Sequence, residues 1–221
     1  MIDLHTHSIF SDGELIPSEL VRRAAVAGYR AIAIADHGDF SNFDLIIPRL
    51  LRGIAGLREH FGIEVLAGIE LTHLPPPMIA AAVAEVRKLG AQVVVCHGET
   101  LSEPVAPGTN RAAILAGVDI LAHPGLITPE EVHLAKERGV LLEISTRKGH
   151  SLANGYVAKL AMAIGAGLVI DTDSHSPDDL TPWAKAEKIA LGAGLTPEQI
   201  VGMRRNSELL VKKVTGRVLT L

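Results

Sequence analysis

The sequence predicts an α/β domain in which parallel strands close into a β/α barrel. Seven short, nearly continuous apolar runs alternate with helix signals along the 221 residues. Such runs are typical of a parallel sheet buried on both faces. No linker or low-complexity segment divides the chain, so we expect one domain over residues 1–221. Seven successive units without a composition break favour closure into a barrel over two separate domains, and 48% hydrophobic residues suffice for a sizeable core.

The expected elements follow from these runs and from the residues that interrupt them. Strands are predicted over residues 2–7, 31–35, 64–70, 92–97, 119–123, 140–145 and 168–175. Helices are predicted over about 18–27, 44–60, 78–89 and 128–139, in short segments before Gly117 and Gly165, and over about 182–191, 197–203 and 207–214. Glycines close several of them, and Thr128-Pro129-Glu130-Glu131 combines an N-cap, a first-turn proline and acids on the helix dipole.

Residues that can bind metal ions stand where the predicted strands end. His5 and His7 are two apart on the first strand, so both imidazoles point to the same face. Six of the seven strands end in a histidine or a carboxylate, which are His5/His7, Asp36/His37, Glu70, His97, His123 and Asp173/His175. In β/α barrels the chemistry lies at the carboxyl ends of the strands. We therefore expect these side chains to converge on one mouth.

Composition excludes several other classes of protein. A net charge of −4 gives no basic surplus for a phosphate backbone, and 3% aromatic residues make a stacking platform for single strands improbable. One cysteine, Cys96, excludes an intrachain disulfide and fits a reducing compartment. The sequence shows neither a secretory signal nor a long apolar run. A cytoplasmic protein without a membrane segment, and without stable nucleic-acid binding, is expected.

The ordered motifs resemble the PHP (polymerase and histidinol phosphatase) family along the whole chain. They are His5-Thr6-His7 with Ser11-Asp12-Gly13, Ala35-Asp36-His37, Gly68-Ile69-Glu70, the His97 strand, Ala122-His123-Pro124 and Thr172-Asp173-Ser174-His175. The resemblance implies a distorted, TIM-like (βα)7 barrel that holds two or three divalent transition-metal ions. Zinc, manganese and iron suit this mixture of imidazoles and carboxylates.

Carried over position by position, the resemblance implies three groups of ligands. One ion would take His5, His7, Glu70 and Asp173. A second would take Glu70, His97 and His123, so that Glu70 bridges the two ions. A third would take Asp12, His37 and His175. Some relatives have histidine where this chain has Asp12, which makes the third site the least certain of the three. No cluster position is occupied by an apolar residue, which argues against the catalytically silent branches of the family.

Other residues are expected to support the cluster or to lie away from it. Asp36 adjoins His37 but faces the other way, and we count it among the residues that serve the reaction by supporting the ligands. Asp3 is expected to hydrogen-bond a ligand histidine, and Glu143 is either a support or a structural buried acid. Cys96 should face away from His97. Histidines expected on the surface are His60, His73 and His133.

The loop after the sixth strand is expected to bind substrate. Arg147 could clamp a phosphate with two hydrogen bonds, and it is therefore assigned to both catalysis and substrate binding. Lys148 and His150 lie on the same loop and are further candidates for substrate binding. For Arg147 and Lys148, the competing interpretation is that they are solvated charges of the loop. The long loop over residues 99–110 should form one wall of the pocket.

The predicted function is that of a metal-dependent phosphatase acting on a small phosphorylated substrate. Metal ions lower the pKa of bound water, towards about 7 at one zinc site, so that a hydroxide can attack phosphorus in line. The resemblance adds histidinol phosphate, and with it histidine biosynthesis, as the named candidate. Two alternatives remain: a phosphodiesterase or nuclease for nucleotides and short oligonucleotides, and, less favoured, a non-catalytic subunit like the ribonuclease P protein. The sequence leaves the oligomeric state open.

Overall fold

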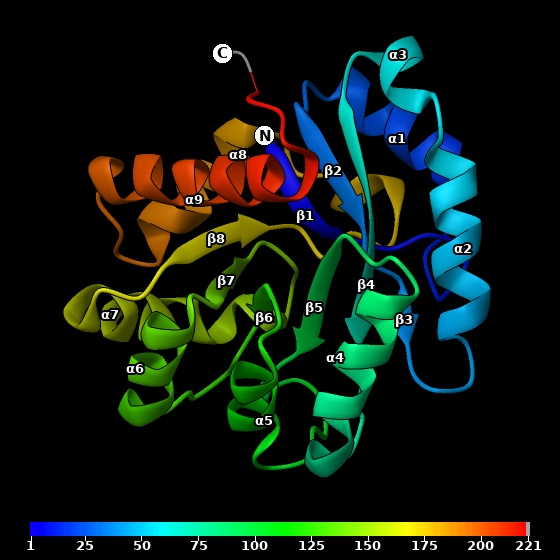
Figure 1. Cartoon of the computed structure of the whole chain (residues 1–221). Coiled ribbons are helices and arrows are strands. Elements are labelled where there is room, and N and C mark those ends of the chain that lie inside the picture. The colour runs from blue at the N-terminus through cyan, green and yellow to red at the C-terminus, as the bar shows by residue number, and fades with distance from the viewer. Residues whose placement is uncertain (220–221) are drawn as a thin grey trace.

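The computed structural model describes residues 1–219 and has the predicted architecture, a parallel sheet rolled into a nearly closed barrel with helices around it (Figure 1). The strands of the barrel are β1 (Ile2–Thr6), β2 (Ala31–Ile34), β4 (Glu64–Leu71), β5 (Val93–His97), β6 (Ile120–Ala122), β7 (Leu141–Ser145) and β8 (Leu168–Asp171), in that spatial order. A two-residue strand, β3 (His37–Gly38), pairs with β4 beyond the end of β2. The α/β barrel fold is confirmed.

The first and last strands close the barrel through their carboxyl ends. The backbone nitrogen of His7 donates to the Ser174 carbonyl at 2.8 Å, and the nitrogen of Asp173 donates to the His5 carbonyl at 2.9 Å. Thr6 and Ser174 also form a parallel bridge. These bonds bring the first histidine motif and the last aspartate motif together, although some 165 residues separate them.

Helices cover the outside of the barrel. They are α1 (Pro17–Val26), α2 (Phe43–Ile54), α3 (Leu57–Phe61), α4 (Ile79–Lys88), α5 (Thr109–Ala116), α6 (Pro129–Arg138), α7 (Asn154–Ile164), α8 (Trp183–Gly192) and α9 (Pro197–Thr215). Short 3-10 turns are η1 (Pro76–Met78), η2 (His150–Ala153) and η3 (Pro177–Asp179). Helix α6 begins with the predicted cap, in which Thr128 and Glu131 form a reciprocal capping box.

Beyond boundary shifts of one residue, the predicted elements differ from the structure in three places. The helix predicted over 44–60 is two helices, because Ala55 is extended and Gly56 adopts a left-handed conformation. The two helices predicted over 197–203 and 207–214 are one helix, α9. Its buried face continues without interruption through Ser207, whose hydroxyl donates a hydrogen bond to the Met203 carbonyl. The last strand ends at Asp171, before Asp173 takes a positive φ.

The apolar core has two parts that the barrel wall separates. The larger one fills the space between the sheet and the surrounding helices, and it includes the buried Cys96. The smaller one fills the barrel interior with side chains such as Leu4, Leu66 and Val95. Cys96 therefore faces away from the barrel mouth, as predicted. No helix within residues 1–219 is both long enough and apolar enough to cross a membrane.

Candidate metal centre

A cavity of about 270 Å³ opens at the carboxyl ends of the strands. Its lining consists of Asp12, His37, Thr72, His73, His97, Glu103, His123, Arg147, His150, Asp173 and His175. His5, His7 and Glu70 lie beneath it and are at most 1% exposed. A larger hollow of about 580 Å³ lies at the amino ends of β5, β6 and β7, but the acid that lines it, Asp119, is already paired with Arg87 and Lys213. The metal-binding side chains thus gather at one mouth.

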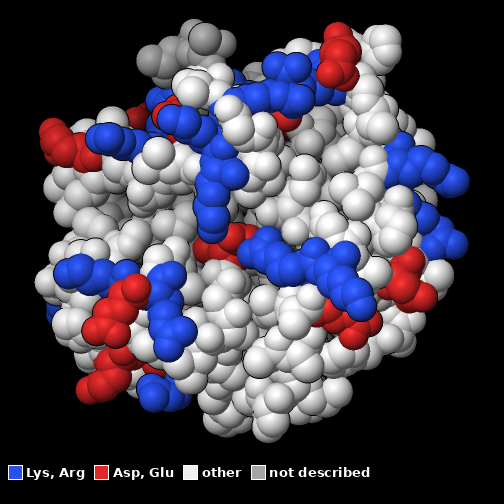
Figure 2. All heavy atoms as spheres, viewed as in Figure 1, with Lys and Arg blue, Asp and Glu red and all other residues white. Residues whose placement is uncertain are grey.

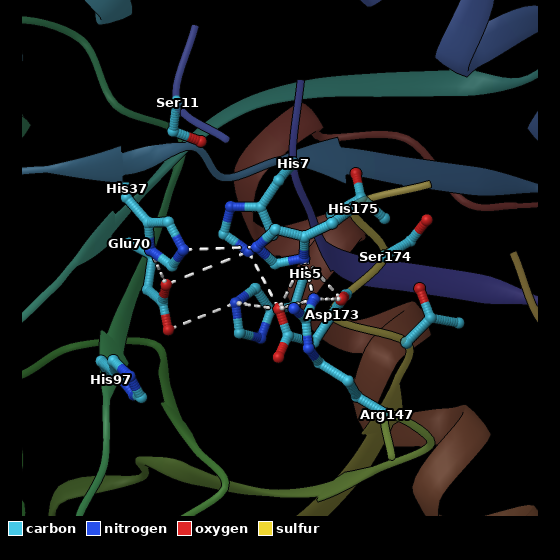
Figure 3. Close-up of polar contacts among 12 residues, drawn as sticks. His5, His7, Ser11, His37, Glu70, His97, Arg147, Asp173, Ser174 and His175 are labelled. Carbon is cyan, nitrogen blue, oxygen red and sulfur yellow. Dashed lines mark hydrogen bonds and ion pairs between the residues drawn. The ribbon is translucent and has the colours of Figure 1, made fainter. Parts of the chain in front are cut away.

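The floor of the cavity is formed by strand β1 and by the segment after β8 (Figure 3). His7 Nε2 lies 3.1 Å from Asp173 Oδ1, and His5 Nε2 lies 3.8 Å from the same oxygen. His5 Nε2 also lies 3.3 Å from Glu70 Oε1. Each of His5, His7 and Asp173 offers one atom within 4.8 Å of the others, a grouping that could hold one ion. Together with Glu70, which lies beside His5, these are the residues of the first predicted ligand group.

The second predicted group, Glu70, His97 and His123, is also brought together within 4.8 Å. His123 Nε2 lies 3.7 Å from Glu70 Oε1, and the His97 and His123 rings meet edge to face at 4.5 Å. Glu70 also contacts His37, a residue of the third predicted group, because its other oxygen lies 2.6 Å from His37 Nδ1. The position of Glu70 between several imidazoles suits the predicted bridging role.

The third predicted group lies on the more open side of the cavity. Asp12 Oδ1 is 3.1 Å from His175 Nε2 and 3.4 Å from His37 Nε2, and the side chain of Asp12 is 60% exposed. His7 completes a four-residue cluster with them, and its ring stacks on that of His175 at 4.0 Å. This group is therefore assembled as predicted, with Asp12 as its most exposed member.

Buried polar atoms test whether these residues fit metal ions. Buried nitrogen and oxygen atoms in folded proteins nearly always have hydrogen-bond partners. Here the buried atoms without such a partner include His5 Nε2, both ring nitrogens of His7, Glu70 Oε1, His97 Nδ1 and His123 Nδ1. These atoms belong to the predicted ligands; within residues 1–219, Asp171 Oδ2 is the one other buried side-chain atom without such a partner. Imidazole nitrogens with carboxylate oxygens are the donors that zinc, manganese and iron accept. The donor set fits two or three such ions.

The same neighbours shift the pKa values of these groups. Burial alone would raise the pKa of Glu70, but the imidazoles of His5, His97 and His37 lower it well below its ordinary value. Burial disfavours protonation of His37, yet Glu70 and Asp12 raise its pKa to about 9. Burial lowers the pKa of His7 to about 3. Without a bound metal ion, the positive charge that keeps Glu70 ionised therefore lies on imidazoles of the cluster other than that of His7.

Supporting residues hold the ligands from outside. Glu143 accepts a hydrogen bond from His5 Nδ1 at 2.7 Å and one from the backbone nitrogen of His123 at 2.9 Å, so it supports two ligands. Asp3 hydrogen-bonds a ligand histidine as predicted, but through the backbone nitrogen of His5 and not through its imidazole. Its carboxylate accepts from the hydroxyl and backbone nitrogen of Thr172 and from the backbone nitrogen of His5, which places it in the barrel closure.

Asp36 is buried and does not line the cavity. Its carboxylate accepts hydrogen bonds from the backbone nitrogen and hydroxyl of Ser8, both at 2.7 Å, and from the hydroxyl of Ser11 at 2.8 Å. Burial raises the pKa of Asp36, and these bonds oppose that rise. Asp36 thus shapes the loop that presents Asp12, and this geometry supports a positioning role rather than contact with a reacting group.

The residues predicted to bind substrate differ in position. Arg147 lines the cavity, donates to the Asp173 carbonyl at 2.8 Å and contacts His175 Nδ1 (Figure 3). His150 also lines it, stacks on His123 at 4.0 Å and binds Thr100 Oγ1 through Nδ1 at 2.8 Å. Lys148 is exposed and is not among the lining residues. The loop after β7 therefore contributes Arg147 and His150 to the cavity.

Three lining residues were missed, which are Thr72, His73 and Glu103. His60, His73 and His133 are exposed as predicted, but His73 also lines the cavity instead of lying apart from it. Its Nε2 is 3.3 Å from Glu103, a residue of the long loop 98–108 that also lies 2.7 Å from His97 Nε2. The position of His73, three residues after Glu70 at the end of a strand, was the available signal. Nothing in the sequence pattern distinguished Glu103 from the other polar residues of its loop.

Known proteins resemble this chain over most of its length. An uncharacterized protein of Methanocaldococcus jannaschii is 48% identical over 200 residues, which is 90% of this chain and 92% of that protein. A probable phosphatase of Thermoanaerobacter sp. (strain X514) is 27% identical over 229 residues, covering 91% of this chain and 89% of the relative. A probable phosphatase of Clostridium botulinum (strain Hall) is 26% identical over 245 residues, covering 99% and 96%.

Solved structures support the fold alone. A crystal structure of a Xaa-Pro dipeptidase with bound methionine aligns with a TM-score of 0.66 at 15% identity, over 100% of this chain and 76% of that chain. The structure of an ADAL–IMP complex aligns with a TM-score of 0.58 at 12% identity, over 95% and 91%. The family model described as PHP domain matches residues 3–137. With the strand-end motifs gathered in one cavity and this match over more than half of its length, the chain belongs to the PHP domain family.

Proposed function

We propose that the protein is a metal-dependent phosphatase that hydrolyses a small phosphomonoester. The observation that carries this proposal is the gathering of nine side chains able to bind metal, some with buried atoms that lack a hydrogen-bond partner, around and beneath a cavity that Arg147 lines. The relatives described as probable phosphatases support the same reaction class. When bound, ions of this kind lower the pKa of water towards neutrality and neutralise charge on phosphoryl oxygens.

The protein's own residues would orient the substrate. Arg147 is held by the Asp173 carbonyl, which aligns its guanidinium at the wall of the cavity. A guanidinium has five N–H donors, so those not used for this anchor can bind phosphate oxygens. His150 is held by Thr100 and presents its other ring nitrogen towards Glu103 and Asp173, at 3.4 Å and 3.6 Å. Arg147 would thus bind the phosphate, while His150 would shape the wall beside it.

Cavity size and surface charge favour a small monoester over a polynucleotide. The cavity of about 270 Å³ suits a compact ligand. On the face shown in Figure 2, basic side chains form short groups that uncharged residues separate and acidic residues interrupt. The net charge of −4 gives a nucleic-acid backbone little to bind. Histidinol phosphate is one member of the substrate class, and nucleotides and short oligonucleotides are the alternative.

A substrate screen tests the proposal. The protein, loaded with manganese or zinc and with its metal content measured, is assayed on histidinol phosphate, sugar phosphates and nucleoside monophosphates, and on phosphodiesters of similar size. We expect turnover of at least one monoester, abolished by removal of the metal and faster than that of any diester. Faster diester cleavage would favour the alternative, and no turnover of any ester by the metal-loaded protein would contradict the proposal.

A further inference from the structure

A second cluster of metal-binding side chains lies at the rim of the cavity. His73, His97 and Glu103 each offer one atom within 4.8 Å of the others, and neither His73 nor Glu103 belongs to the nine residues of the inner cluster. Glu103 Oε2 lies 2.7 Å from His97 Nε2 and 3.3 Å from His73 Nε2. Two imidazoles and one carboxylate form a donor set that zinc accepts, with a fourth position left for water.

The backbone at His73 resembles that of the inner ligands. Within residues 1–219, the non-glycine residues with positive φ are His73, His123 and Asp173, at 53°, 27° and 52°. Such conformations are strained in non-glycine residues, and they cluster at functional sites. His123 and Asp173 are both predicted metal ligands. His73 shares their unusual conformation and the same cavity, which sets it apart from an ordinary surface histidine.

Glu103 is held at the rim by the structure of its loop. Glu99 anchors both arms of the loop, because its Oε1 accepts from the backbone nitrogens of Gly108 at 3.0 Å and Asn110 at 2.9 Å. Thr100, near the start of the loop, binds His150 at 2.8 Å. Glu103 Oε1 in turn lies 3.4 Å from His150 Nε2. These contacts direct the Glu103 carboxylate towards the histidines rather than towards solvent.

The two clusters share His97, and this restricts how they can be used. A neutral imidazole has one nitrogen with a free lone pair, so His97 can bind an inner ion or a rim ion, but not both. The clusters also differ in access: the side chains of His73 and Glu103 are 41% and 38% exposed, whereas those of Glu70 and His123 are 1% exposed. An ion from solvent can therefore reach the rim donors before the inner ones.

We propose that His73, His97 and Glu103 form an additional transition-metal site that captures an ion from solvent and passes it to the inner cluster. His97 is the shared ligand at which the ion exchanges Glu103 and His73 for Glu70 and His123. The inference rests on the metal cluster of the proposed function, but it concerns how that cluster is filled. It predicts that the rim residues control the rate of metal uptake while the inner residues determine how much metal is finally held.

Zinc uptake by metal-free protein tests this without any substrate. Zinc is delivered from a coloured chelator to wild-type protein, to His73→Ala, to Glu103→Gln and to the double variant, and the uptake rate and the final zinc content are measured. We expect the double variant to take up zinc more slowly, on the order of 10-fold or more, which is the scale of losing supporting contacts at a metal site. Its final zinc content and urea midpoint should match wild type. His60→Ala and His133→Ala, which remove exposed histidines elsewhere, should keep the wild-type rate.

Two results would overturn the proposal while leaving the inner cluster intact. One is an uptake rate in the double variant equal to that of wild type, since the rim would then have no part in loading. The other is a final content lower by one ion per chain, since His73 and Glu103 would then be permanent ligands. A wild-type chain that takes up no zinc at all would contradict both the rim site and the proposed function, so the two failures are distinguishable.

Discussion

Glu143 Oε1 on strand β7 lies 2.7 Å from His5 Nδ1 on strand β1, and both side chains are fully buried. This bond fixes the His5 ring so that Nε2 faces the cluster, and it makes a buried carboxylate part of the metal site although it is not a ligand of the predicted set. Burial disfavours protonation of His5, but Glu143, Glu70 and Asp173 raise its pKa well above the ordinary value. Metal binding must therefore displace a proton from this ring.

The first prediction concerns this pair. Glu143→Gln should weaken metal affinity by about 10- to 100-fold, because the amide neither carries the charge nor fixes the ring in the same way. Competition with a chelator measures the affinity. Glu64→Gln is the matched control: Glu64 is also a buried strand carboxylate, but it pairs with Arg58 and Arg217 at the amino end of β4, so metal affinity should stay at the wild-type value. An unchanged affinity in Glu143→Gln would refute the supporting role.

The second prediction compares two carboxylates of the cluster. Glu70→Ala should reduce activity more than Asp12→Ala, because Glu70 is buried between the imidazoles of several groups while the side chain of Asp12 is 60% exposed and serves one group. Loss of a bridging charge can remove several kcal/mol of transition-state stabilisation. The assay compares kcat/KM at matched metal occupancy. Equal losses in the two variants would contradict the assigned roles.

The third prediction separates substrate binding from metal binding. Arg147→Ala should keep metal content and folding, but lower kcat/KM by roughly 10- to 1000-fold, as expected for losing a charge-assisted hydrogen bond or a somewhat stronger transition-state contact. Arg147→Lys should recover part of the loss, since lysine keeps the charge but not the guanidinium fork. Inhibition by inorganic phosphate should weaken in parallel.

Lys148→Ala is the control for Arg147, because Lys148 is the next residue along the loop and lies outside the cavity lining. We expect its kinetics to match wild type. If Arg147→Ala retains wild-type kcat/KM and phosphate inhibition, Arg147 is a loop charge, and His150 becomes the next residue to test.

Eight of the nine predicted ligands could be placed at the mouth from the sequence, because they stand at the ends of predicted strands. Parallel strands place their carboxyl ends at one mouth, so a histidine or carboxylate at such an end needs no long-range information to be located. Asp12 is the exception, since it lies on a loop and its place came from the family motif. Glu103 shows the limit of this reasoning. Its position depends on the anchoring of loop 98–108 by Glu99 and on contacts with His150, which is some 50 residues away in the sequence.

The single helix α9 and the bonds of Asp3 to Thr172 were not predicted, for a related reason. Ser207 resembled a helix start, but tertiary packing buries it on the inner face of one long helix. Asp3 is near the ligand His5 in sequence, yet its carboxylate bonds to Thr172, because the barrel closes between β1 and β8. In both cases contacts between distant segments decided the outcome.

The fourth prediction concerns the backbone beneath loop 98–108. Gly125 has a φ of +59°, and a Cβ there would lie 1.8 Å from the Glu99 carbonyl oxygen. Gly117→Ala is the control, because its φ of +76° is also positive but a Cβ there would meet open space; it should cost about 1–2 kcal/mol. Gly125→Ala should cost about 1–3 kcal/mol more through this overlap. Urea unfolding of both variants checks the difference, and equal stabilities would show that the overlap relaxes freely.

The measurement that tests the central claim most directly is the metal content of the purified protein. We expect elemental analysis, before and after reconstitution, to find two or three zinc, manganese or iron ions per chain, because His5, His7, Glu70, His97 and His123 present buried nitrogen and oxygen atoms without a hydrogen-bond partner. Less than about one ion per chain after reconstitution would contradict the account, since one ion is the least that a metal-dependent site of this kind requires.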